Sequence, residues 1–318
     1  MKVTDHLKNT KKTIFSFEVL PPLKGSGIKA VYDMLDPLME HKPPFINVTY
    51  HRSEYIYKKN TSGGFNKVFV RKRPGTIGIC ASIQNKYQVD AVPHLICGGF
   101  TKDATEDALI ELHFLDIDNV LLLRGDAIKS ESIFIPEDNG HAFALDLVNQ
   151  VNSMNRGNYL DDDLQGVVCT NFCVGVAGYP EKHFEAPNLK SDLKFLKAKI
   201  DSGADYIITQ MFFDNNHFLQ FVKHCREEGI TVPIIPGIKP ITRKKQISTI
   251  PRTFHVDIPE ALYDAIEACE TNEAVEQVGT EWCVNQCKEL MALDEVNCVH
   301  FFTMGNSKQI TKILNQIG

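Results

Sequence analysis

The feature that most constrains the fold of this chain is a short apolar run that recurs along its whole length. Runs of this size are typical of strands that are buried on both faces of a parallel sheet. Segments with helical periodicity separate most of them, so the sequence predicts alternating strands and helices. The runs lie at residues 13–18, 45–50, 91–97, 119–125, 172–178, 205–210, 233–238 and 299–304.

Several intervening segments carry helix signals. After Thr101, apolar residues recur with helical spacing and acidic residues fall in the first turn, where they favour the helix dipole. Two further helical patterns end at Gly203 and Gly229, and a glycine just past the last turn is a common C-cap. The segment 76–87 fits a strand or a helix. We interpret it as a helix because the alternation requires one there.

This alternation predicts an α/β protein, specifically a (β/α)8 TIM barrel that forms a single domain over residues 1–318. A doubly wound sheet is the weaker alternative, because no GxGxxG motif follows the first run. Residues 153–166 are polar and rich in aspartate, and we expect them to form an exposed insertion.

The composition of the chain argues against a nucleic-acid-binding, membrane-spanning or secreted protein. Hydrophobic residues make up 43% of the chain, which is enough for a full core, and the net charge is −6. No long Lys/Arg block is present, so we expect no nucleic-acid partner. No run approaches ~20 apolar residues, and residues 1–12 lack the apolar core of a signal peptide. We therefore expect a cytoplasmic protein that does not bind membranes.

The nine cysteines are scattered along the chain. The pairs Cys169/Cys173 and Cys283/Cys287 have three residues between them, which is not the CxxC spacing of a zinc site. We expect reduced and mostly buried thiols, and no bound metal.

Polar residues stand at or near the ends of six predicted strands. In a TIM barrel the carboxyl ends of the strands form one rim, which carries the functional residues. Each residue taken alone has a plain structural explanation, such as a hydrogen-bonded core histidine or an ion pair in a turn. Together they predict an active site on this rim. They are Glu18, Thr49, Tyr50, His94, Arg124, Asp126, Tyr179, His183 and Gln210.

Glu18 ends the first run, and Pro21 and Pro22 prevent the strand from continuing. A carboxylate at the mouth of a buried strand loses hydration, which disfavours its charged form and raises its pKa. A raised pKa is what a general acid needs near neutral pH. Glu18 is therefore a candidate proton donor.

Seven motifs then connect the chain to a known family. FSFEVLPP, NVTY, PHLIC, LLRGD, GYPEKH, ITQMFFD and IPGIKP resemble, in order and spacing, those of bacterial-type methylenetetrahydrofolate reductases over about residues 13–303. The resemblance implies a barrel that binds FAD non-covalently. It also implies a ping-pong reaction in which NADH or NADPH reduces the flavin and 5,10-methylenetetrahydrofolate becomes 5-methyltetrahydrofolate, feeding methionine synthesis. We further expect a homo-oligomer, and a catalytic barrel without a C-terminal regulatory domain.

The resemblance also assigns roles to residues. Glu18 matches the general acid, and Asp126 matches a carboxylate beside the flavin. Arg124, His183 and Lys199 match positions suited to the pyrophosphate of FAD. The matched FAD contacts are Thr49, Tyr50, His94, Arg124, Gly125, Asp126, Phe143, Ala144, Tyr179, His183, Ala186, Asp192 and Lys199, and the matched substrate contacts are Glu18, Gln210 and Gln246.

The sequence departs from the family pattern at three positions. Arg52 stands where many relatives have a small residue, and Phe143 replaces a tyrosine. Asn306 replaces an arginine that holds the glutamate tail of the folate. Two explanations stay open: Lys239 or Lys308 substitutes for that missing cation, or the carboxylate of the tail is bound more loosely.

Two alternatives stay open. One is a barrel that binds folate or flavin without catalysis. The other is a metal-dependent barrel lyase or hydrolase with Glu18, His94 and Asp126 as ligands. The sequence does not decide between NADH and NADPH, nor does it give the electron donor or the size of the oligomer.

Overall fold

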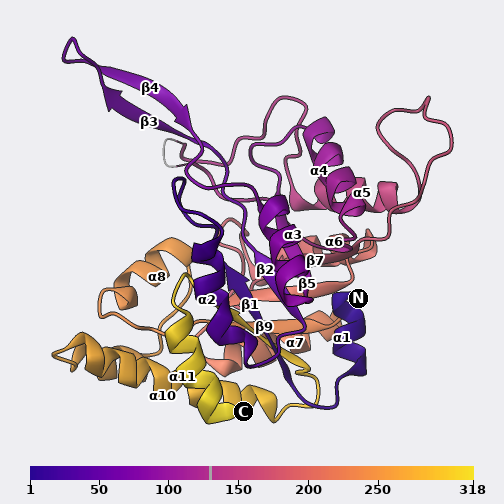
Figure 1. Ribbon diagram of the computed structural model, residues 1–318. Coiled ribbons are helices and arrows are strands. Elements are labelled where there is room, and N and C mark those ends of the chain that lie inside the picture. Colours follow the sequence, from indigo (N-terminus) through magenta and orange to yellow (C-terminus); the bar gives the residue numbers. More distant parts are fainter. Residues whose placement is uncertain (129–130) are drawn as a thin grey trace.

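The computed structural model describes residues 1–128 and 131–318. Its parallel strands close into a barrel in the order β1-β10-β9-β8-β7-β6-β5-β2 (Figure 1). Each of these strands overlaps one predicted apolar run, so the predicted (β/α)8 barrel is confirmed. The strands are β1 (Ile14–Val19), β2 (Phe45–Val48), β5 (Asp90–Ile96), β6 (Asn119–Leu123), β7 (Cys173–Gly178), β8 (Tyr206–Met211), β9 (Ile234–Ile238) and β10 (Cys298–Phe302).

Helices surround the barrel and cover its outer face (Figure 1). The predicted helix signals are confirmed: the Thr101 side chain caps α4, while Gly203 and Gly229 follow α6 and α7 with positive φ. The ambiguous segment 76–87 is helical. The helices around the barrel are α2 (Lys29–Met39), α3 (Thr76–Tyr87), α4 (Lys102–Phe114), α5 (Ala144–Asn155), α6 (Leu189–Asp201), α7 (Asn215–Glu227), α8 (Gln246–Phe254), α9 (Glu260–Glu267), α10 (Asn272–Met291) and α11 (Ser307–Ile317).

The alternation of side chains along each strand separates the core from the site. In β1, Phe17 and Val19 are fully buried and belong to the apolar cluster that joins the strands to α2. Ser16 points into the barrel, where its hydroxyl contacts His300 of β10. Glu18 lies one step further along the same inward face, at the carboxyl end of the strand.

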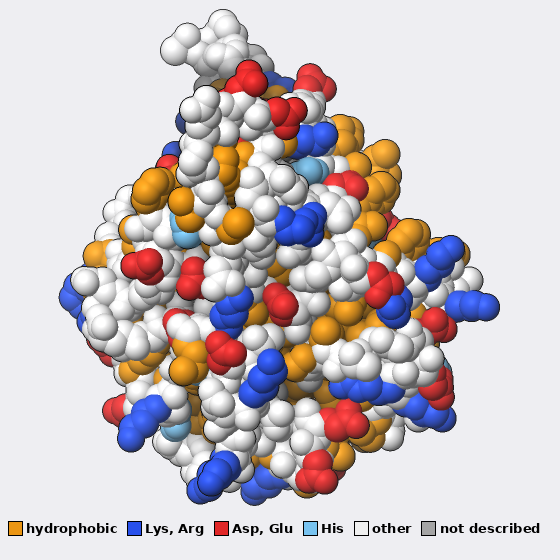
Figure 2. Space-filling view, turned by 90° about the vertical axis from the view of Figure 1, so that its right-hand side faces the viewer, with side chains coloured by type: hydrophobic (Ala, Val, Ile, Leu, Met, Phe, Trp, Pro, Cys, Tyr) orange, Lys and Arg blue, Asp and Glu red, His pale blue; other side chains and the backbone are white. Residues whose placement is uncertain are grey.

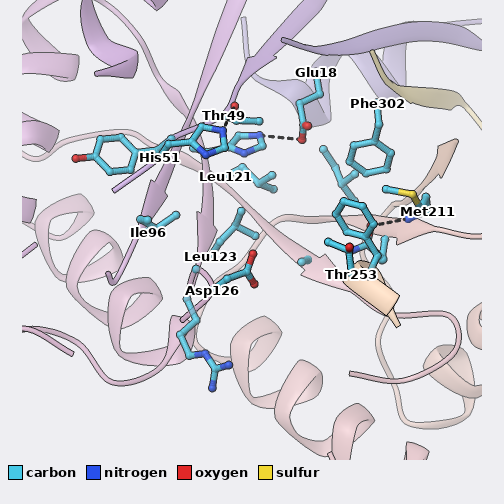
Figure 3. Close-up of a pocket in the computed structure, with 18 of the residues that line it drawn as sticks. Glu18, Thr49, His51, Ile96, Leu121, Leu123, Asp126, Met211, Thr253 and Phe302 are labelled. Atoms are coloured by element: carbon cyan, nitrogen blue, oxygen red, sulfur yellow. Dashed lines mark hydrogen bonds and ion pairs between the residues drawn. The ribbon is translucent and has the colours of Figure 1, made fainter. Parts of the chain in front are cut away.

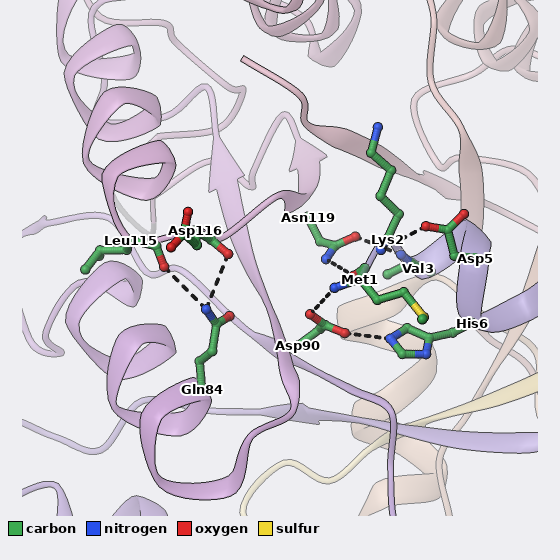
Figure 4. Close-up of polar contacts among 10 residues, drawn as sticks. All are labelled: Met1, Lys2, Val3, Asp5, His6, Gln84, Asp90, Leu115, Asp116 and Asn119. Atoms are coloured by element: carbon green, nitrogen blue, oxygen red, sulfur yellow. Dashed lines mark hydrogen bonds and ion pairs between the residues drawn. The ribbon is translucent and has the colours of Figure 1, made fainter. Parts of the chain in front are cut away.

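A short helix that was not predicted, α1 (Val3–Asn9), packs against the amino end of the barrel, and Figure 4 draws the polar contacts made there. Val3 and Leu7 are buried in the cluster that fills this end. The Val3 amide donates to Asn119 Oδ1 at 2.8 Å, and His6 Nε2 lies 2.6 Å from Asp90 Oδ2. Since the amino end is sealed in this way, a ligand must enter from the carboxyl end.

An antiparallel hairpin of β3 (Glu54–Lys59) and β4 (Phe65–Val70) is the main addition to the predicted fold. It follows β2 and projects away from the barrel (Figure 1). The predicted insertion at 153–166 is correct only in part. Helix α5 continues to Asn155 with Met154 buried, because its last turn packs into the core, and the largely exposed loop begins at Arg156.

Most cysteines are buried free thiols, as expected; Cys169 is exposed and Cys269 is half-buried. Within residues 1–128 and 131–318, no three His, Cys, Asp or Glu side chains gather in a way that could hold a metal ion. No helix in the same ranges has both the length and the apolar character needed to cross a membrane. On the face in Figure 2, Lys and Arg are interspersed with Asp and Glu.

Candidate active site

A cavity of about 610 Å³ opens at the carboxyl end of the barrel. Its inner wall is apolar and includes Ile96, Leu121 and Leu123, while its rim is polar (Figure 3). This combination is typical of a binding site for an organic ligand. Ten of the predicted site residues line it together: Glu18, Thr49, Tyr50, His94, Arg124, Gly125, Asp126, Tyr179, His183 and Gln210.

Glu18 points into this cavity from the end of β1 (Figure 3). Burial raises the pKa of its carboxyl to about 8. The side chain is nevertheless 18% exposed, and that exposed part faces the opening through which a ligand reaches it. At neutral pH the carboxyl therefore holds its proton at a position open to the cavity.

Three histidines, His51, His94 and His300, line the same cavity as Glu18. His94 Nε2 lies 3.3 Å from Asn47 Oδ1, and burial, followed by the nearby His300 and His51, lowers the pKa of His94 to about 3. His300 Nδ1 lies 2.8 Å from Ser16 Oγ, and burial lowers its pKa to about 3 as well. Both rings are thus neutral at pH 7. His300 Nε2 is buried and has no hydrogen-bond partner among the described residues, although His300 lines the cavity.

The loop after β6 places a cation and an anion on the rim. Gly125, with φ +83°, makes the turn between Arg124 and Asp126, and a Cβ there would lie 3.1 Å from Ile96 Cδ1. Arg124 Nη1 forms an ion pair of 2.5 Å with Glu185 Oε2. Asp126 is free of ion pairs among the described residues and points into the cavity (Figure 3). Glycine at 125 therefore allows the close turn that exposes both side chains.

Arg52 occupies a neighbouring part of the rim. Its Nη2 forms an ion pair of 2.8 Å with Glu131 Oε2, and its guanidinium lies 5.6 Å from the centre of the Phe134 ring. Arg124 approaches the same ring at 5.2 Å. The two guanidinium groups and Phe134 thus form one cation–π cluster at the edge of the cavity. This cluster gives the unusual arginine at position 52 a structural role.

The loop after β7 carries aromatic side chains that contact one another along the rim of the cavity. The rings of Tyr179 and His183 meet edge to face at 4.7 Å, and His183 lies 4.8 Å from Phe184. Phe184 stacks on His255, which follows α8, at 4.4 Å and 18°. Glu181 Oε2 accepts a hydrogen bond of 2.6 Å from the Asp257 amide, which ties the two loops together.

Asp192, Lys199 and Ala186 support this loop without lining the cavity. Asp192 Oδ2 accepts from the His183 amide at 2.8 Å, and Ala186 donates its own amide to the His183 carbonyl. Lys199 Nζ donates to the Ala177 carbonyl of β7 at 3.0 Å, and burial lowers its pKa to about 8. Some positions matched to FAD contacts therefore lie behind the cavity lining, where they hold His183 and the end of β7 in place.

The remaining predicted residues lie outside the cavity lining. Phe143 is 61% exposed and precedes α5, whose first residue is Ala144. Gln246 uses its side-chain oxygen to accept from the amides of Thr242 and Arg243, at 2.7 and 2.9 Å. The roles of these three positions as ligand contacts stay predictions.

Sequence reasoning missed several cavity residues, including His51, Arg73, Phe184, His255 and His300. A signal existed for His300: it is the one strongly polar residue in the apolar run 299–302. Arg73, Phe184 and His255 come from three loops far apart in the sequence, and no local pattern marks them.

Comparisons with known proteins identify the family that this chain resembles. The profile of the family described as methylenetetrahydrofolate reductase matches residues 2–318. Methylenetetrahydrofolate reductase (NADH) 1 of Arabidopsis thaliana is 34% identical over an alignment of 331 positions, which covers 100% of this chain and 51% of that protein. The 5,10-methylenetetrahydrofolate reductase of Pectobacterium carotovorum is 28% identical over 306 residues, or 95% of this chain and 89% of that one. The chain thus spans about half the length of relatives such as the Arabidopsis protein.

Solved structures with low sequence identity share the fold. An uncharacterized protein from Clostridium thermocellum, described as binding two copies of 5-methyl-5,6,7,8-tetrahydrofolic acid, has a TM-score of 0.55 at 13% identity over 98% of this chain and 96% of that one. Oxaloacetate acetylhydrolase has a TM-score of 0.51 at 11% identity over 99% of this chain and 83% of that one. These likenesses support the barrel alone.

Proposed function

This chain belongs to the methylenetetrahydrofolate reductase family, and we propose that residues 1–318 form a catalytic barrel that reduces 5,10-methylenetetrahydrofolate to 5-methyltetrahydrofolate. In this proposal NADH or NADPH supplies the electrons, FAD carries them, and the barrel works as a homo-oligomer in the cytoplasm. The product would feed methionine synthesis.

The observation that carries the proposal is the position of Glu18, whose carboxyl points into the cavity from the end of β1. The five-membered ring of the substrate must open before a hydride can reach the methylene carbon. Glu18 Oε donates its proton to the departing ring nitrogen, the carbon–nitrogen bond breaks, and an iminium cation forms. With a pKa of about 8, Glu18 is protonated at neutral pH and regains its proton from solvent through the open side of the cavity.

The cavity fits a flavin. Its apolar inner wall suits a flat ring system, and the buried, unpartnered His300 Nε2 on its lining suits a polar edge of that ring or of the substrate. We propose that Thr49, His94, Asp126 and Tyr179 hold the ring system, with Arg124 and His183 near the pyrophosphate. A bound flavin would supply the hydride that ends on the methylene carbon.

In this proposal Asp126 influences the charges that develop during the reaction, and Gln210 contacts the ligands. Asp126 places a negative charge on the rim, which stabilises a cationic iminium and opposes negative charge on the reduced cofactor. Gln210, near the end of β8, lines the cavity and offers an amide group that can contact the folate and the nicotinamide in turn.

Anaerobic spectroscopy of the purified protein tests this function. We expect a yellow protein whose flavin absorbance bleaches on addition of NADH or NADPH and returns on addition of 5,10-methylenetetrahydrofolate, with 5-methyltetrahydrofolate as product. A colourless protein that takes up no FAD, or a reduced protein that the folate never reoxidises, would refute the proposal.

The spectroscopic assay and a chelator dialysis distinguish this function from the two alternative functions. A non-catalytic folate- or flavin-binding barrel gives binding without bleaching and recovery. A metal-dependent lyase loses activity after dialysis against chelator, whereas the proposed flavoenzyme keeps it.

A further inference from the structure

The arginine and lysine side chains that line the cavity, and the nearby His51, differ in what neutralises them. Arg52 is paired with Glu131, Arg124 with Glu185, and Lys72 with Glu54. Lys182 is held by the carbonyl groups of His183 and Ala186, and burial lowers the pKa of His51 below its ordinary value. Among the described residues, Arg73 is the remaining arginine or lysine of the lining.

Arg73 forms no ion pair with any described residue. Its Nη1 donates to the carbonyl of Pro21, three residues after Glu18 in the chain. Lys72 lies next to it, and the Lys72 carbonyl accepts from the Lys24 amide at 2.9 Å. The base of the β3–β4 hairpin is thus bound to the segment that follows β1. This binding holds Arg73 on the cavity rim beside the strand that carries Glu18.

We propose that Arg73 binds the carboxylates of the folate's γ-glutamyl tail. This inference rests on the proposed function and assigns a subsite within it. When the reacting ring lies at Glu18, the remainder of the folate must extend out of the barrel, and it ends in carboxylates. A guanidinium without a carboxylate partner at that exit is matched in charge and geometry to such a group.

The other candidate cations are less suited to this role. Lys239 is only 6% exposed, and burial lowers its pKa to about 8. Neither Lys239 nor Lys308 lines the cavity. Asn306, at the position of the family's arginine, accepts from the Gln309 amide at 3.3 Å and caps α11. In the barrel, β1 lies between β10 and β2. Asn306 follows β10, whereas Arg73 follows the hairpin that comes after β2. The proposed cation therefore lies on the opposite side of β1 from the family's arginine position.

The phosphates of a nicotinamide dinucleotide have similar anionic chemistry, so the test must separate the two ligands. Arg73→Gln removes the charge. Arg73→Lys keeps the charge and controls for the loss of the contact with Pro21. Lys67→Gln, on β4 away from the cavity, controls for a general loss of positive charge. Flavin content equal to wild type checks that each variant is folded.

The measurements are dissociation constants for mono- and triglutamyl 5-methyltetrahydrofolate, from perturbation of the flavin spectrum, and the rate of flavin reduction at varied NADH and NADPH. We expect Arg73→Gln to weaken monoglutamate binding by about tenfold, and the triglutamate by more, since each added glutamate brings another carboxylate. Arg73→Lys should recover most of the loss. Lys67→Gln and the nicotinamide half-reaction should be unchanged.

An unchanged folate affinity in Arg73→Gln would overturn the assignment. A loss confined to NADPH or NADH would overturn it too and would assign the anion site to the dinucleotide. Both results are distinct from failure of the proposed function, in which the wild-type protein itself is not reduced by nicotinamide or not reoxidised by folate.

Discussion

His94 Nε2 lies 3.9 Å from Glu18 Oε2 at the inner end of the cavity. By distance alone this is an ion pair, but burial raises the pKa of Glu18 to about 8 and lowers that of His94 to about 3. Between these values both side chains are neutral. The histidine therefore leaves the proton on Glu18 instead of drawing it away, which is the state that a general acid requires.

Replacing Glu18 by glutamine should separate the two half-reactions. Glutamine keeps the size of the side chain but cannot deliver a proton. We expect Glu18→Gln to retain FAD and to be reduced by nicotinamide at a near-normal rate, while folate reduction slows by at least about 10²-fold. Stopped-flow absorbance measures both rates. A folate half-reaction within a few-fold of wild type would refute the role of Glu18.

The same substitution should change how stability depends on pH. Glu18 has a pKa of about 8 in the folded protein and 4.5 as its ordinary value. Below pH 4.5 both states hold the proton. Between pH 4.5 and 8 only the folded state does, so the contribution of Glu18 to stability falls as pH rises through this window.

The Glu18→Gln variant has no ionisable group at this position, so its stability does not fall in this way as pH rises. Its free energy of unfolding should therefore rise relative to wild type between pH 4 and pH 9, by on the order of 2–4 kcal/mol. Urea denaturation of the flavin-saturated proteins at several pH values measures it. Parallel curves for the two proteins would mean that the Glu18 pKa is not raised.

Asp126→Asn should affect the half-reactions in opposite ways. Removing the negative charge from the rim makes the bound flavin a better oxidant and its reduced form a poorer hydride donor. Reduction by nicotinamide should be unchanged or faster, and folate reduction should be slower. Equal losses in both steps, measured with matched flavin content, would contradict this electrostatic role.

Glu185→Gln should tighten FAD binding. Glu185 Oε2 lies 2.5 Å from Arg124 Nη1, so in the proposed site this carboxylate competes with the pyrophosphate for the same guanidinium. We expect the dissociation constant of FAD to fall by a few-fold, as measured by fluorescence quenching of the flavin. Lys197→Gln, which breaks an exposed helical ion pair with Asp201, is a matched control. Weaker FAD binding in Glu185→Gln would show that the pair supports the site.

His183→Ala and Lys199→Ala should weaken FAD retention, and most strongly at high salt, where screening already weakens contacts with phosphate. His183 lines the cavity, whereas Lys199 acts from behind the loop through Ala177. Since the pKa of Lys199 is lowered to about 8, its charge and its contribution should fade as pH rises from 7 to 9. Full flavin content in both variants after high-salt dialysis would show that neither side chain contributes to FAD binding.

The sequence predicted the barrel because its buried strands have a local signature. Apolar runs such as 45–50 and 119–125 are continuous, and glycines end the helices between them. The hairpin β3–β4 was missed although its signal was present: two alternating segments flank the turn residues Asn60–Gly64. Helix α1 has only seven residues, too few for a clear period.

The sequence by itself determined which residues stand at the strand ends, because period and turn chemistry are local properties. Glu18, Arg124 and Asp126 could be named as site residues for this reason. Only the tertiary structure decided their electrostatic states. Burial by distant strands sets the pKa of Glu18, and pairing with a carboxylate 61 positions away neutralises Arg124. Arg73 stays unpaired because the hairpin places it on the rim. Such pairings and desolvation depend on positions in space, which no local pattern encodes.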